Sequence, residues 1–176
     1  MRILTILLLL FLQGAVPATV RAQCLALADL LAIGAEPTAL SAPPVVTRHL
    51  SFEWVYNGPS ASSREVFWAF PTPGEGALPA SRLLVRAQRP GQDVVLKTTQ
   101  VACVRQLRSE LKSRKLEAQP VTCPGCEAVR FKGPDFEATF YSQMKGDYPY
   151  VVVVHQGTVA IPDPAAKGQA QSQPRK

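Results

Sequence analysis

The sequence predicts an α+β fold in which two short helices pack on a mainly antiparallel sheet within one compact domain. Three observations support this prediction. Several segments alternate apolar and polar residues with the two-residue period of a strand. Turns containing Gly and Pro separate these segments, and only two segments carry a helical pattern.

The two helices are expected near the start and in the middle of the chain. Residues Cys24 to Ile33 form a short apolar run that Gly34 ends, because glycine is favoured just past a helix. Residues Cys103 to Leu116 are amphipathic, with Val104, Leu107 and Leu111 on one face. The segment from Glu36 to Pro44 is interpreted as a connector, because its prolines cannot continue a helix.

The expected strands fall into two groups, one before and one after the second helix. The first group is Leu50–Tyr56, Glu65–Phe70, Arg82–Ala87 and Asp93–Thr98, the last two joined by a Pro90-Gly91 turn. The second group is Glu127–Lys132, Phe136–Tyr141 and Tyr148–Gln156. Four consecutive valines in the last segment predict a strand at the centre of the sheet with both faces covered.

The two halves of the chain share an order of elements. Residues 24–100 and 103–157 each start a helix on a cysteine and continue with strands and a Gly-Pro turn. This order suggests two degenerate α-β-β-β repeats, while chance similarity between short segments remains the alternative.

The N-terminus predicts export to the periplasm or the extracellular space. Residues 1–22 have the basic start, short apolar core and small-residue boundary of a signal peptide, with cleavage expected after Ala22 and Ala18 as second choice. A lipid-modified Cys24 is disfavoured because Gln23 precedes it. Residues 23–160 then form the exported domain, without a further transmembrane segment, and residues 161–176 have the composition of a disordered tail.

The charge of the chain favours a protein partner over nucleic acid. The formal net charge is +6, and the surplus gathers in Arg105 to Lys115 and in the tail rather than among aromatic residues. The expected partner is another envelope or extracellular protein, and the pattern indicates no oligomeric state.

An exported chain with four cysteines predicts structural disulfides at Cys24, Cys103, Cys123 and Cys126. We favour the pairs Cys24–Cys103 and Cys123–Cys126, and a Cys103–Cys123 pair remains open. A redox role for the CPGC sequence is disfavoured because a strand pattern, not a helix, follows it. No metal and no cofactor are expected, since only one close pair of cysteines exists.

Motifs for a catalytic site are absent from the sequence, so no catalytic residue is assigned. Aromatic residues on the expected strands instead suggest a binding face made of Trp54, Tyr56, Trp68 and Tyr141, unless the helices cover them. The sequence therefore predicts a disulfide-stabilised, non-enzymatic binding module. The alternative is a thiol redox factor or a small hydrolase that uses the cysteine pair of CPGC or His155.

Overall fold

The computed structural model describes residues 24–58, 66–88 and 91–157. The expected signal peptide with its cleavage after Ala22, and the expected tail 161–176, lie outside these residues. The helices are α3 (Leu27–Gly34), α4 (Pro43–Thr47) and α5 (Val101–Ser113). The strands are β1 (Val55–Asn57), β2 (Phe67–Phe70), β3 (Ser81–Ala87), β4 (Gln92–Thr98), β5 (Ala118–Val121), β6 (Glu127–Lys132), β7 (Phe136–Ser142) and β8 (Tyr150–Gln156).

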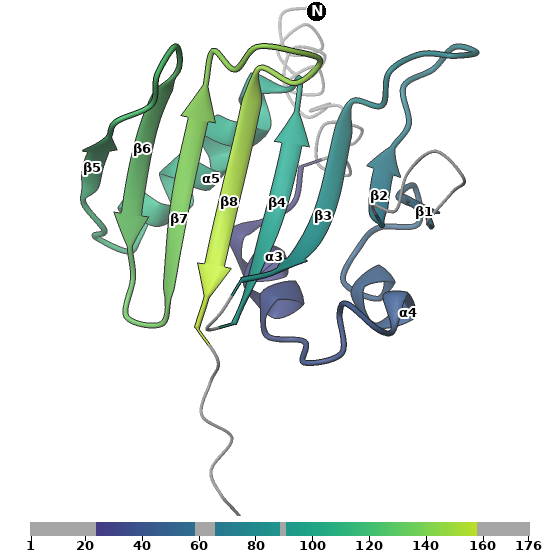
Figure 1. Cartoon of the computed structure of the whole chain (residues 1–176), viewed down its shortest axis with the longest axis horizontal. Coiled ribbons are helices and arrows are strands. Elements are labelled where there is room, and N and C mark those ends of the chain that lie inside the picture. Colours follow the sequence, from purple (N-terminus) through teal and green to yellow (C-terminus); the bar gives the residue numbers. More distant parts are fainter. Residues whose placement is uncertain (1–23, 59–65, 89–90, 158–176) are drawn as a thin grey trace, which may run out of the picture.

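All eight strands belong to one antiparallel sheet with the order β1-β2-β3-β4-β8-β7-β6-β5. The sheet therefore has the strands that precede α5 in one half and the strands that follow α5 in the other half. The two halves meet where β4 pairs with β8, in a continuous register from Gln92–Gln156 to Thr98–Tyr150. Both longer helices, α3 and α5, lie on one side of the sheet, behind it in Figure 1. The fold is α+β, as expected, and the sheet dominates it.

The core lies between these helices and the sheet. Leu30 and Ile33 of α3 and Leu107 and Leu111 of α5 are fully buried. The sheet meets them with the helix-facing side chains of its central strands, Leu96, Phe140, Val152 and Val154. Each helix thus buries the apolar face that its sequence pattern predicts.

Side chains from other elements fix both ends of α3. At its start, the Glu110 carboxylate of α5 accepts a hydrogen bond from the Leu27 N–H at 2.8 Å. At its end, the Gln92 side-chain amide of β4 donates to the carbonyls of Gly34 and Glu36 at 2.7 and 2.9 Å. Backbone groups that a helix end leaves without partners are thereby satisfied, and α3 is held against both α5 and the sheet.

Three expectations about local structure are wrong. The segment Glu36–Pro44 is not only a connector, because Pro43 starts the additional helix α4. The expected strand Leu50–Tyr56 is reduced to β1, which begins at Val55 after a turn. The stretch that follows α5 contains an additional strand, β5, so the second group has four strands rather than the three expected.

The valine strand β8 is central, but only one of its faces packs against helices. Val152 and Val154 are buried on the helix side, while Val151 and Val153 are half-buried on the opposite side. Within the described residues, no helix lies on that opposite side, which faces the viewer in Figure 1. We call it the open face of the sheet.

Candidate functional site

The candidate site is built on α4, a helix that two adjacent prolines start. Pro43 and Pro44 occupy the first helical positions, where the missing N–H costs nothing and the fixed φ angle suits the helix. The Thr47 hydroxyl donates back to the Pro43 carbonyl at 3.4 Å. The same proline chemistry that suggested a connector therefore begins a helix here.

The short helix α4 contacts the buried aromatic residue Trp68 of β2. The Trp68 indole N–H donates to the Thr47 hydroxyl at 3.0 Å, and Trp68 is 1% exposed. Trp54 is 4% exposed and packs edge-on against Phe70, with 5.7 Å between ring centroids. Trp54 and Trp68 are therefore buried, which matches the alternative that these aromatic residues belong to the core, although α4 was not among the expected helices.

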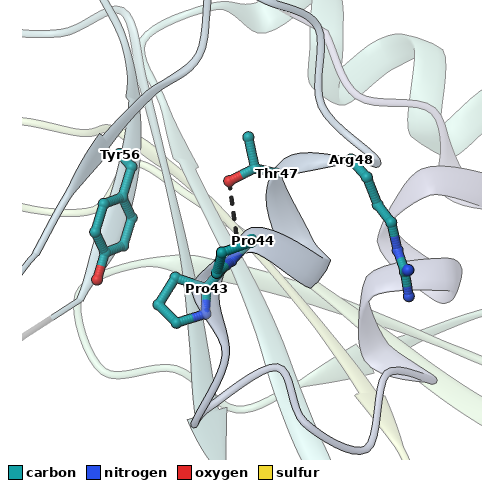
Figure 2. A pocket seen from close by; sticks show the side chains of 5 residues that line it. All are labelled: Pro43, Pro44, Thr47, Arg48 and Tyr56. Carbon is teal, nitrogen blue, oxygen red and sulfur yellow. Dashed lines mark hydrogen bonds between the residues drawn. The ribbon is translucent and has the colours of Figure 1, made fainter.

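Tyr56, the aromatic residue of β1, keeps a large exposed surface. Its ring lies 5.4 Å from that of Trp68, and 42% of the residue remains accessible. Together with Pro43, Pro44, Thr47 and Arg48 it lines a cavity of about 540 Å³. Figure 2 shows Tyr56 on one side of the two proline rings and Arg48 on the other. We call this cavity the proline–tyrosine groove.

A carboxylate anchors the far end of α4. Glu36 accepts hydrogen bonds from the Arg48 guanidinium at 2.6 Å and pairs with His49 Nε2 at 2.9 Å. The hydrogen bond with His49, and next the one with Arg48, hold the pKa of Glu36 below its ordinary value. Because Arg48 also lines the groove, this cluster fixes one of its walls.

Exposed apolar side chains surround β1, which is an edge strand of the sheet. Phe52 is 94% exposed and Val55 is 53% exposed. Val55 and Tyr56 point to opposite faces of the strand, since neighbouring side chains alternate. The edge of the sheet thus carries apolar surface on both of its faces, and no charged residue lies in β1.

Tyr141 and His155 lie together on the open face, away from Tyr56. His155 Nδ1 lies 2.8 Å from Asp93 Oδ1, and Glu137 stands opposite His155 in the β7–β8 register. Tyr141 and Thr139 help to line a shallow polar depression of about 270 Å³ around this pair. The four aromatic residues of the expected binding face therefore do not share one surface.

The depression contains a histidine and an aspartate, two members of a catalytic triad, but neither serine nor cysteine is among the residues that line it. An aspartate that orients a histidine is part of a catalytic triad. Thr139 and Tyr141 bring hydroxyl groups to the lining, and Thr139 is 7% exposed and accepts a hydrogen bond from Arg130 at 3.3 Å. Glu137 is likewise engaged, by Arg130 at 3.5 Å and Lys132 at 3.4 Å.

All four cysteines lie in pairs at disulfide distance. Cys24 pairs with Cys103, with 4.9 Å between Cα atoms, and this helix disulfide is buried between the starts of α3 and α5. Cys123 pairs with Cys126, with 5.3 Å between Cα atoms, and this turn disulfide closes the β5–β6 hairpin. Strand β6 begins directly after Cys126, so no helix N-terminus is present to activate a thiol there.

No family model matches the chain, and neither a curated protein nor a solved structure matches it. Within the described residues, no helix has the length and apolar character needed to cross a membrane. The described part of the chain also holds no group of three His, Cys, Asp or Glu residues suited to a metal ion.

Proposed function

We propose that the protein is a non-enzymatic binding module that receives an extended apolar segment of another protein along β1 and in the proline–tyrosine groove. The observation that carries the proposal is the exposure of Tyr56, which lines the groove, together with that of Val55 on the other face of β1 and of Phe52 shortly before it in the chain. An edge strand offers backbone hydrogen bonds to an added strand, and a neighbouring pocket gives side-chain specificity. Because β1 carries no charge, an uncharged segment of the partner fits it best.

We further propose that the protein acts in an oxidising compartment, either the periplasm or the extracellular space. The two cysteine pairs at disulfide distance support this, because disulfides persist mainly in exported proteins. The signal-like residues 1–22 support it as well.

A duplication of one helix-and-sheet unit is the third part of the proposal. Each half contains a longer helix followed by four antiparallel strands, and the last strands of the halves, β4 and β8, pair with each other. The helix disulfide joins the starts of both helices. An experimental structure in which α3 with β1–β4 fails to superpose on α5 with β5–β8 in the same order would contradict a duplication.

Site-specific photo-crosslinking tests the binding function. A benzophenone amino acid replaces Tyr56 in one sample and Tyr141, on the open face, in a matched control. Both samples are irradiated in an extract of exported proteins. We expect a discrete adduct from position 56 only, and we expect Val55→Glu to abolish it because a charge would enter the apolar edge.

Two outcomes would contradict the proposal. Equal adducts at both positions would indicate contact without a preferred surface. An adduct at position 56 that survives Val55→Glu would place the partner elsewhere. A His155→Ala variant that loses a hydrolytic activity of the purified protein would instead support the enzyme alternative.

A further inference from the structure

Basic side chains follow one side of α5. Arg105, Arg108 and Lys112 are spaced by three and four residues, so they are neighbours along the helix surface, and Lys115 follows in the turn that ends the helix. We call these four residues the basic stripe. Its helical part, from Arg105 to Lys112, extends over about 10 Å at a rise of about 1.5 Å per residue. Arg105, Lys112 and Lys115 are exposed, and Arg108 lies closer to the sheet with its guanidinium 5.4 Å from the centre of the Phe140 ring.

The charges of the basic stripe are not neutralised within the described part of the chain. None of the ion pairs there involves any of the four residues. The acid of α5, Glu110, is turned toward other groups, because its carboxylate accepts from the Leu27 N–H and from the Gln106 amide. The stripe therefore presents a line of uncompensated positive charge.

Lys115 occupies a position where glycine is the usual residue. Its φ is +61°, and the bonds Lys115 N–H to Lys112 O (2.8 Å) and Leu116 N–H to Leu111 O (3.2 Å) form a Schellman cap. A side chain in this conformation destabilises the backbone relative to glycine. The lysine adds a fourth charge at the end of the stripe, which is a functional reason for keeping it.

The surroundings of the basic stripe restrict the kind of partner. A membrane surface would require exposed apolar side chains to insert, but the apolar face of α5 is buried in the core. Single-stranded nucleic acid would require aromatic residues between the cations, and α5 has none. A protein partner would require a central apolar anchor; the exposed large apolar residue of α5, Val101, lies at its first position, and the outer positions further along hold Ala102, Gln106, Ser109 and Ser113.

We infer that the basic stripe of α5 is a binding site for a linear sulfated polysaccharide. Such a ligand carries closely spaced fixed anions and binds through charge and hydrogen bonds rather than through apolar contacts. Guanidinium groups are suited to it, because their fork of N–H donors matches the geometry of tetrahedral oxyanions. This site is separate from the proline–tyrosine groove and does not depend on the function proposed for the groove.

Heparin is the probe for this inference. The dissociation constant of the full chain for heparin is measured at several NaCl concentrations. By the counterion-release relation known for nucleic acids, four contacts give a log–log slope of about −3. We expect the triple variant Arg105→Gln, Lys112→Gln, Lys115→Gln to reduce the magnitude of this slope by about 2 to 3. The variant Lys115→Gly is expected to reduce it by about 1 while leaving Tm unchanged or higher.

A control variant distinguishes the effect of losing the basic stripe from the effect of lowering the net charge. Lys97→Gln, Arg114→Gln and Lys145→Gln remove the same charge from side chains that lie outside the stripe and have no ion pair within the described residues. We expect this control to keep most of the wild-type slope. Equal losses in the stripe and control variants would overturn the site. Tighter binding, at the same salt concentration, to polyglutamate or to vesicles of phosphatidylserine would overturn the assignment of a polysaccharide.

Discussion

The helix disulfide is expected to contribute far more to stability than the turn disulfide. The perturbation is the replacement of both cysteines by alanine, either at Cys24 and Cys103 or at Cys123 and Cys126. The two pairs differ in the length of chain they close, because their sequence separations are 79 and 3 residues. A longer closed loop removes more entropy from the unfolded chain.

The magnitudes follow from the chain-entropy relation. Closing the long loop contributes about 4.5 kcal/mol at 25 °C, and closing the short loop contributes about 2 kcal/mol. The helix pair is also buried, at 8% and 1% exposure, so its removal leaves a small packing defect in addition. A loss of this size is a large share of the about 5–15 kcal/mol that stabilises a typical domain.

Urea unfolding followed by tryptophan fluorescence measures both losses. Trp54 and Trp68 are buried on the helix side of the sheet, so their emission reports exposure of the core. If the variant without the helix disulfide is unfolded in buffer alone, its unfolding is measured in a stabilising osmolyte together with the wild type. Losses that are equal for the two variants, or larger for the turn disulfide, would refute the reasoning from loop length.

Three further predictions concern the order in which the disulfides are reduced, the stability of the fold at acidic pH and the substitution of two turn glycines. Mild reductant should open the turn disulfide before the helix disulfide, as measured by mass after alkylation, because the former lies at an exposed turn; simultaneous reduction would contradict this. Stability should fall as pH drops below the ordinary carboxyl range, since the folded pKa of Glu36 is lowered by His49 and Arg48, and Glu36→Gln should flatten this part of a pH–Tm profile. Gly91→Ala should lower Tm more than Gly125→Ala, because both have positive φ but only at Gly91 would a Cβ collide with the backbone carbonyl that ends β8.

Most of the sheet could be predicted from its alternation of apolar and polar residues. Strand β6 has the predicted limits, and β3, β4 and β7 differ from theirs by one residue at one end. The favoured cysteine pairs, Cys24–Cys103 and Cys123–Cys126, are confirmed, although the sequence had left a Cys103–Cys123 pair open. These features depend on local patterns, which a single sequence carries.

The helix that contacts Trp68 could not be predicted from the same local patterns. Helix α4 has five residues, too few for a hydrophobic period, and its stability depends on tertiary contacts such as the Trp68–Thr47 hydrogen bond. The signal was the pair Pro43-Pro44, which suits the first turn of a helix as well as it suits a connector. Because α4 was not predicted, the sequence left open whether Trp54 and Trp68 are exposed or lie beneath helices, and the candidate binding face included both.

Strands β4 and β8, the last strands of the two halves, pair with each other, and this affects how the chain folds while the ribosome synthesises it. When α3 and β1–β4 have emerged, one edge of β4 has no partner until the residues of β8 are made. That edge belongs to a strand with the apolar sequence Val94, Val95 and Leu96. An exposed apolar edge favours association between nascent chains. A chain that stops before Tyr150 keeps this edge open, so truncated products of this protein should aggregate rather than persist as a smaller folded domain.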